Sequence, residues 1–306
     1  MSEANSRVIV QLDNRVRFVA AVLAVSQWPA MEQEEQPHAV HTQSKISRQF
    51  MSAFASEPVV ETVNRTLTDG GSLSELFTAA VCCAWPSFAV QEPLPARFMD
   101  QTFSQQLAAC AQTAAPAEKL WPEHTAVWQE AADELTEIFK DSPLPSFLAR
   151  LTGETLHKDI VIVPTLTYPM LNSVICETAQ QLFVVLPPPK AWGESPPWPF
   201  RDGVEWALSE SCRELLHHLM GDVVSEQLEL LKHAAATLFL EESLTEVESM
   251  SYLVRAKRQY QLPQLPVFVE QLRDCLADEQ QTVYELLAIP KPKKKDELDT
   301  KKEVPM

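Results

Sequence analysis

The sequence predicts a predominantly helical α+β protein with a small central sheet, and three observations support this. Apolar residues recur at three- and four-residue spacing through most of the chain, which is typical of amphipathic helices. Two apolar runs in the middle, 159–166 and Gln181–Leu186, are rich in β-branched residues, as buried strands are. Glycine occurs only 6 times, which argues against a turn-dense all-β fold.

The first half of the chain begins with an alternating segment, 7–13, which we expect to be a strand, and continues with a buried helix over 15–27. Residues 29–38, rich in Glu, Gln and Pro, are expected to form a loop. Further helices are expected at 40–55, 58–67, 72–84, 96–113, 125–139 and 147–151. Ser72 is a plausible N-cap because its hydroxyl can accept from a free backbone N–H of the first turn.

The second half is expected to contain the two central strands, with a helix-like segment, 171–178, between them. A proline-rich linker follows at 187–199, and we expect Trp192 and Trp198 to pack against the core; an SH3 or WW ligand is the alternative. Helices are then expected at 202–220, 222–242, 246–260 and 266–287. Gly221 is expected to end the first of them as a C′ residue.

These elements suggest two lobes in one compact unit. We expect an N-terminal strand and helical lobe over 1–156, a core with the strand pair and the C-terminal helices over 157–288, and a disordered tail over 289–306. The only basic run, 291–295, lies in that tail.

Charge and cysteine content limit the classes of function. The formal net charge of −17 disfavours nucleic acids and anionic membranes as partners, because both are polyanions. The 6 cysteines form no CxxC motif and lie among apolar residues, which favours reduced, buried thiols. The N-terminus has no secretory signal, and no apolar run approaches the length of a membrane span, so we expect a soluble cytoplasmic protein.

One helical segment carries a possible catalytic pattern. In the HExxH motif, two histidines one turn apart bind zinc, and the glutamate after the first acts as general base. Glu214 and His217 occupy the second and fifth positions of such a motif, whereas Arg213 stands where the first histidine belongs. A pair of Glu and His at this spacing is by itself more often an ordinary helix surface.

The order of elements around this helix resembles a bacterial family of uncharacterised zincin-like metallopeptidases. The resemblance covers residues 7 to about 260 and includes the segment Asn14-Arg15-Val16-Arg17-Phe18, a strand pair and the HExxH helix. The family also has a later helix with a Glu-Ser-Leu-Val-Arg-Ala signature, whose glutamate is a zinc ligand. Here the corresponding segment begins with Ser251.

Carried over residue by residue, the resemblance implies a degenerate zinc site. Glu214 is the vestigial general base and His217 the vestigial ligand, and two of three ligand positions are lost, at Arg213 and Ser251. Glu248 and His218 are possible substitute ligands. Because an arginine cannot shed its proton, it would repel a zinc dication. A structural alternative is that Arg213 pairs with Glu210, one turn earlier, and holds the helix face together without metal.

The resemblance therefore implies a catalytically inactive pseudo-metallopeptidase without a cofactor, which binds a protein or peptide partner. One alternative is an active zinc-dependent hydrolase with a displaced metal site. A second alternative is a plain helical interaction protein, in which the segment around Glu214 is only a helix surface. We expect the strand Gln181–Leu186 to pack beside the helix that carries Glu214, as the edge strand does in zincins.

Overall fold

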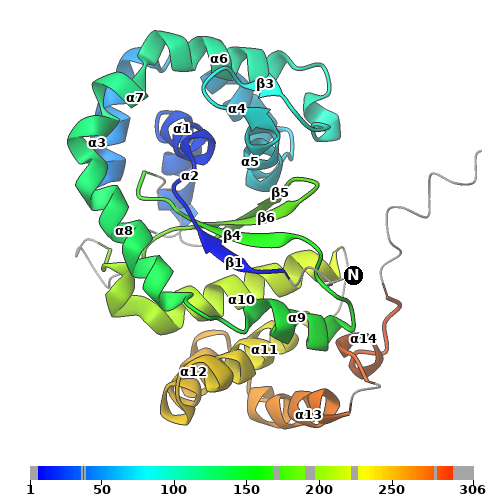
Figure 1. The fold of residues 1–306 in the computed structure, drawn as a ribbon. Coiled ribbons are helices and arrows are strands. Elements are labelled where there is room, and N and C mark those ends of the chain that lie inside the picture. Colours follow the sequence, from blue (N-terminus) through cyan, green and yellow to red (C-terminus); the bar gives the residue numbers. More distant parts are fainter. Residues whose placement is uncertain are drawn as a thin grey trace, which may run out of the picture.

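A mixed four-stranded sheet lies between two layers of helices, so the fold is predominantly helical α+β, as predicted (Figure 1). The computed structural model describes residues 6–35, 37, 39–167, 173–189, 197–221, 227–278 and 281–291. The predicted tail after 291 and Trp192 lie outside the described residues. None of the described helices is both long and apolar enough to cross a membrane.

The sheet has the strand order β1-β4-β6-β5. Its strands are β1 (Val8–Val10), β4 (Asp159–Pro164), β6 (Gln181–Leu186) and β5 (Val174–Glu177). The first three are parallel, whereas β5 is antiparallel to β6. The central strands β4 and β6 are apolar over almost their whole length because helices cover both faces. A separate two-stranded ribbon consists of β2 (Cys83–Ala84) and β3 (Ala89–Val90).

Successive residues of the central strands face opposite cores, as the alternation along a strand requires. Val161, Val163, Phe183 and Val185 belong to the core shared with the first helical layer. The first layer comprises α1 (Asn14–Leu23), α2 (Trp28–Glu35), α3 (Thr42–Met51), α4 (Pro58–Thr68), α5 (Leu73–Val81), α6 (Thr102–Ala114) and α7 (Pro116–Lys119).

The other face of the sheet packs against the second helical layer. Ile160, Ile162, Leu182 and Val184 belong to this second core. The helices on this side are α8 (Thr125–Ile138), α9 (Leu144–Thr152), α10 (Val204–Met220), α11 (Leu228–Ser243), α12 (Glu246–Gln259), α13 (Leu265–Ala277) and α14 (Val283–Leu286). Of these, α8 and α10 contact the sheet, whereas α11, α12 and α13 lie on the far side of α10 (Figure 1). Because β6 and α10 share this core, the expected packing of this strand beside this helix is confirmed.

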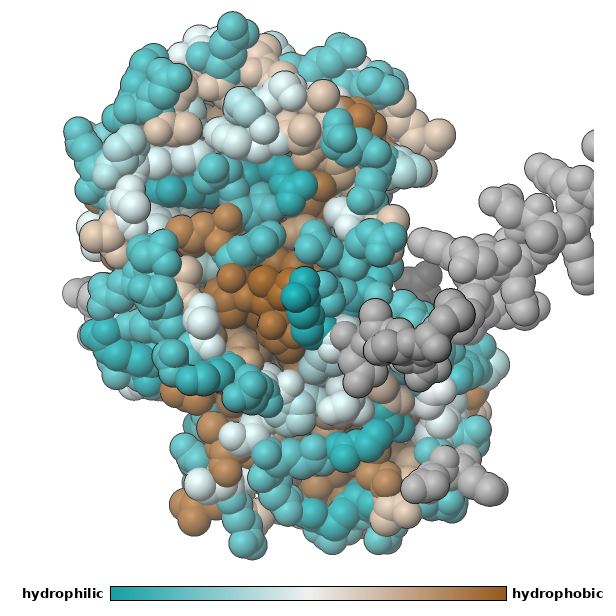
Figure 2. Space-filling model, viewed as in Figure 1, coloured by the Kyte–Doolittle hydropathy of each residue, from teal (hydrophilic) through white to brown (hydrophobic). Residues whose placement is uncertain are grey.

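The two edges of the sheet differ in what covers them. At β5, the Ser74 hydroxyl of α5 donates to the Ile175 carbonyl at 2.6 Å, and the Glu177 N–H donates to the Thr78 hydroxyl at 3.4 Å. At the opposite edge, the β1 residues are only partly buried. Hydrophobic residues reach the surface in the middle of the face seen in Figure 2, where β1 runs in the view of Figure 1.

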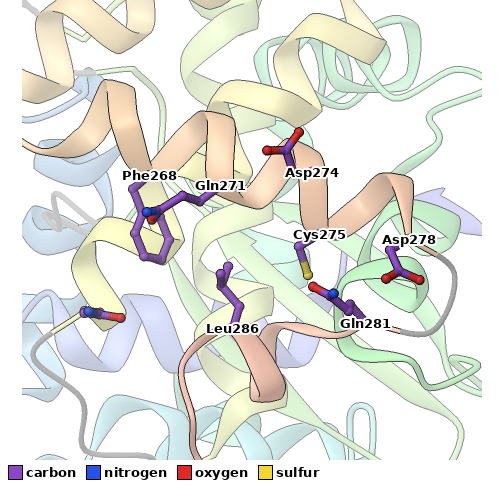
Figure 3. A pocket seen from close by; sticks show the side chains of 8 residues that line it. Phe268, Gln271, Asp274, Cys275, Asp278, Gln281 and Leu286 are labelled. Atoms are coloured by element: carbon purple, nitrogen blue, oxygen red, sulfur yellow. The ribbon is translucent and has the colours of Figure 1, made fainter.

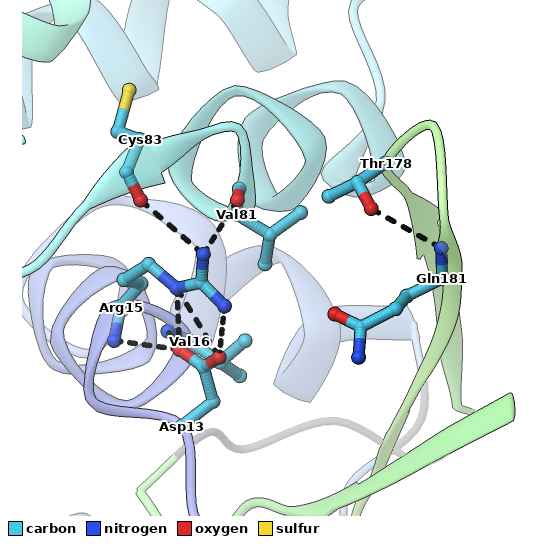
Figure 4. Close-up of polar contacts among 7 residues, drawn as sticks. All are labelled: Asp13, Arg15, Val16, Val81, Cys83, Thr178 and Gln181. Atoms are coloured by element: carbon cyan, nitrogen blue, oxygen red, sulfur yellow. Dashed lines mark hydrogen bonds and ion pairs between the residues drawn. The ribbon is translucent and has the colours of Figure 1, made fainter. Parts of the chain in front are cut away.

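The junction from β1 to α1 is fixed by an aspartate cap. Asp13 is the N-cap of α1 and accepts from the backbone N–H groups of Arg15 and Val16 (Figure 4). The Arg15 guanidinium binds the same carboxylate and donates to the carbonyls of Val81 and Cys83. This network satisfies the free N–H groups of the helix start and ties it to the end of α5.

Four sequence-based expectations were wrong. Residues 29–38 do not form a loop throughout, because Trp28–Glu35 is helical. The segment expected to be helix-like contains the strand β5, whose conformation depends on pairing with β6. The strand β6 is therefore an inner strand and not an edge strand. Trp198 does not pack against the core, since 47% of it is exposed.

Other expectations are confirmed. Ser72 caps α5 in a reciprocal capping box with Glu75, in which each side chain accepts from the other's backbone N–H. Gly221 ends α10 with a positive φ of 64°, a conformation that glycine adopts without a steric penalty. The six cysteines are all free and buried.

Candidate functional site

The helix α10 presents two different faces. Its apolar residues Leu208, Cys212, Leu215 and Leu216 are buried in the second core. Thiol chemistry at Cys212 is disfavoured, because complete burial raises its pKa well above the usual range. The polar face carries Glu210, Arg213, Glu214 and His217, which the 3.6-residue period aligns along one side of the helix.

A buried ion pair joins Glu210 and Arg213. Their side chains are only 2% and 12% exposed, and the guanidinium donates to Glu210 Oε2. The other carboxylate oxygen, Oε1, accepts from the backbone N–H of Ser173 at 2.8 Å and from its hydroxyl at 3.3 Å. The structure thus confirms that Arg213 pairs with the carboxylate one turn earlier.

Electrostatics keeps Arg213 charged in this setting. Burial is the largest single effect and by itself would lower the pKa of Arg213. The electrostatic contributions of Glu210, Tyr252, Tyr260 and Glu214 together outweigh it and raise the pKa. Glu210 in turn is anchored by Ser173, the residue that precedes β5. A fixed cation is therefore built into the position that corresponds to the first zinc ligand of HExxH.

Three aromatic rings form a connected group beside Arg213: His233 of α11, Tyr252 in the middle of α12, and Tyr260 just after α12. The guanidinium carbon of Arg213 lies 5.9 Å from the ring centre of Tyr260. The His233 ring lies against Tyr260 with centroids 4.2 Å apart, and its Nδ1 is 2.7 Å from the Tyr252 hydroxyl. Burial, followed by the charges of Arg213 and Lys232, lowers the pKa of His233 to about 3, so the ring is neutral at pH 7.

Glu214 has the most unusual acidity of the cluster. Burial and then the nearby Glu210 carboxylate raise the pKa of Glu214 to about 7. It makes no hydrogen bond or ion pair with any residue that the structure describes. A carboxyl group in this state exchanges a proton near neutral pH, which is the property that a general base requires.

The two histidines at the end of α10 have different surroundings. The side chain of His217 is exposed. The protein atoms around it still displace some water, and this desolvation together with the charge of Lys232 lowers its pKa. His218 Nε2 lies 3.5 Å from Glu177 Oε2, at the end of β5, and Lys158 donates to the same oxygen at 2.6 Å. Contact with His218 and then with Lys158 lowers the pKa of Glu177 to about 2.

The structure does not bring Ser251 and Glu248 to the cluster. Ser251 is exposed on α12, whereas its neighbour Tyr252 is buried and reaches His233. Glu248 stays at the start of α12, where its backbone N–H and its carboxylate both bind the Thr245 hydroxyl. The residue of α12 that faces the cluster is therefore Tyr252, one position after Ser251, where the resemblance places the lost ligand.

These residues do not fit a zinc ion. Catalytic zinc needs three neutral or anionic protein ligands, and Arg213 offers only N–H donors. Within the described part of the chain, no group of three or more His, Cys, Asp or Glu side chains is arranged to hold a metal ion.

Sequence reasoning found Glu210, Arg213 and Glu214 but missed Ser173 and the two tyrosines. Tyr252 and Tyr260 are eight residues apart, a spacing that places both on one side of a helix, and this was the available signal. The sequence gives no such signal for Ser173, because its contact with Glu210 depends on how the start of β5 is placed relative to α10.

A pocket lies away from this cluster, between α11, α13 and α14, with a volume of about 520 Å³ (Figure 3). Phe268, Cys275 and Leu286 form its apolar part, and Gln271 and Gln281 are among its polar residues. Asp274 and Asp278 also line it, and its described lining includes no histidine or basic side chain.

No protein-family model, curated protein or solved structure matches this chain.

Proposed function

We propose that this chain is a non-catalytic, zincin-like protein that binds a protein or peptide partner. The buried Glu210–Arg213 pair carries the proposal. It places a permanent cation where a metallopeptidase needs a neutral ligand, and that cation has its own carboxylate partner. Removing only one partner of such a buried ion pair destabilises a protein by about 3–5 kcal/mol, because the other charge is left buried and uncompensated.

The covered edge of β5 also supports a non-catalytic role. An extended peptide commonly binds by adding a strand to a free sheet edge. Here Ser74 and Thr78 of α5 already bind Ile175 and Glu177, so this edge has fewer free backbone groups for a peptide strand. A partner would instead contact the exposed side chains beside the cluster, His217 and Tyr260.

Zinc binding tests the non-catalytic part of the proposal. Thermal unfolding of the purified protein should not shift on addition of zinc, and Arg213→His alone should introduce at most a small shift. A saturable zinc-dependent rise in Tm of the unmodified protein would contradict this. So would zinc-dependent peptide hydrolysis that Glu214→Gln abolishes.

A second candidate, a plain helical interaction protein, is supported by an apolar stripe on α12. Val247, Met250 and Val254 are 78%, 49% and 46% exposed, and their spacing aligns them on one side of the helix. Exposed hydrophobic residues that form a row are typical of a surface that another protein covers.

Selection of a random peptide library on the purified protein distinguishes the two candidates. Peptides bound beside the cluster should lose affinity with His217→Ala and Tyr260→Ala and retain it with Met250→Lys. Peptides bound on the α12 stripe should show the reverse pattern. Val267→Lys, on the neighbouring helix α13 and also at an exposed position, is the matched surface control.

A further inference from the structure

Arg17 of α1 is held between two tryptophan rings. Its guanidinium carbon lies 4.4 Å from the ring centre of Trp121 and 4.1 Å from that of Trp128. Trp121 precedes α8 and Trp128 lies within it, and both are at least 95% buried. Contact with the two indoles restricts the orientation of the guanidinium and shields part of it from water.

This cation has no anionic partner among the described residues. Only three of the described arginines are shielded from solvent, and the other two, Arg15 and Arg213, each pair with a carboxylate. The Nε atom of Arg17 is buried and has no hydrogen-bond acceptor. Burial lowers the pKa of Arg17 to about 9, which still leaves it charged at pH 7.

The terminal nitrogens of Arg17 remain open to a ligand. Neither has a hydrogen bond within the part of the chain that is described, and, unlike Nε, neither is closed off from solvent. Because the indoles already contact the guanidinium, its terminal N–H groups are where an acceptor can bind. A buried guanidinium whose terminal N–H groups have no acceptor lacks the anion that would complete an ion pair.

Among the described residues, neutral polar groups lie next to Trp128 and one turn further along α3. Trp128 Nε1 donates to Gln43 Oε1 at 3.4 Å, and Ser47, one turn further along α3, contacts the Thr167 hydroxyl at 3.5 Å. Thr165, just beyond the end of β4, is fully buried and its hydroxyl has no partner. Thr165 and Thr167 follow the carboxyl end of β4, and the carboxyl ends of parallel strands are where α/β sheets commonly bind ligands.

We propose that Arg17, held by Trp121 and Trp128, binds the carboxylate of a small organic acid. A planar carboxylate matches the two terminal N–H groups of the fork in a bidentate pair. One cation compensates one negative charge, so a monocarboxylate fits better than a phosphate dianion, which would leave an excess charge. The net charge of −17 adds to the discrimination against multiply charged anions.

Benzoate and inorganic phosphate are the probes for this site, because benzoate combines a carboxylate with an apolar ring. Tryptophan fluorescence and one-dimensional NMR of the purified full chain should show saturable benzoate binding, with phosphate binding at least about tenfold weaker. Arg17→Met should abolish benzoate binding, and Arg17→Lys should weaken it about tenfold, because a lysine keeps the charge but lacks the fork.

Arg48→Met, at an exposed position on α3, is the control and should leave the affinity unchanged. Near-ultraviolet circular dichroism of each variant verifies that the tryptophan environment is retained. If Arg17→Met does not fold, the Arg17→Lys comparison decides. Failure of the unmodified protein to bind benzoate, equal affinity for phosphate, or unchanged binding by Arg17→Lys would overturn the proposal. None of these outcomes bears on the zinc experiment at Arg213.

Discussion

His233 and Tyr252 form a buried hydrogen bond between α11 and α12, with 2.7 Å from Nδ1 to the hydroxyl oxygen. The other ring nitrogen of His233, Nε2, is buried and has no partner among the described residues. Burial lowers the pKa of His233 to about 3, so the imidazole remains neutral while a guanidinium lies nearby. The pair therefore connects the two helices that surround Arg213 without adding a second charge.

Tyr252→Phe should destabilise the protein by about 1–3 kcal/mol, because it leaves His233 with two buried nitrogens and no partner. Tyr260→Phe is the matched control: Tyr260 is 43% exposed and no hydrogen bond of its hydroxyl is described, so its cost should be within about 0.5 kcal/mol. Urea denaturation measures both changes. Equal costs for the two variants would mean that the His233 contact contributes nothing measurable.

Glu210→Gln and Arg213→Met should each cost about 3–5 kcal/mol, since each leaves a buried charge without its partner. The double variant should cost much less than the sum of the two, because it removes both charges together. A double-mutant cycle by chemical denaturation gives the coupling free energy. Additive costs would show that the two side chains do not interact.

Glu214→Gln should change how stability depends on pH. The folded protein raises the pKa of Glu214 to about 7 from an ordinary value of 4.5, so it binds this proton more tightly than the unfolded chain. The unmodified protein therefore loses stability as pH rises from 4.5 to about 7, by as much as about 3 kcal/mol. Relative to it, the variant should gain stability over this window, whereas a constant difference between pH 4.5 and 8 would contradict the raised pKa.

Glu177→Gln should have the opposite pH profile. The folded protein lowers the pKa of Glu177 to about 2, so its contribution is complete above pH 4.5 and is lost as pH falls toward 2. Because the carboxylate is 35% exposed and screened by water, we expect a loss of only about 1 kcal/mol at pH 7. At pH 2 to 3 the variant and the unmodified protein should converge, which thermal unfolding across this range measures.

The sequence predicted the elements whose signal is local. The strands β4 and β6 are continuous apolar runs, and Ser72 with Glu75 is a local capping box, so both were recognisable. The pair of Glu210 and Arg213 was also recognisable from its one-turn spacing. In each case the interacting residues are neighbours along the chain.

Elements that depend on distant contacts were harder to predict. The strand β5 has only four residues and is defined by its pairing with β6. The contact of Trp128 with Gln43 spans 85 residues, and that of Ser173 with Glu210 spans 37. On α12, the amphipathic pattern alone does not decide whether Ser251 or Tyr252 faces the cluster, because it is compatible with a shift of one residue. That choice depends on which side of α12 packs against α11.

The pairing of β1 with β4 has a consequence for folding during synthesis. Val8 pairs with Ile160, so the first strand must wait for about 150 more residues before its partner leaves the ribosome. Until then the first helical layer lacks Val161 and Phe183, which belong to the sheet side of its hydrophobic core. The nascent N-terminal half therefore exposes apolar surface for an extended time, and binding by a chaperone at this stage would favour productive folding.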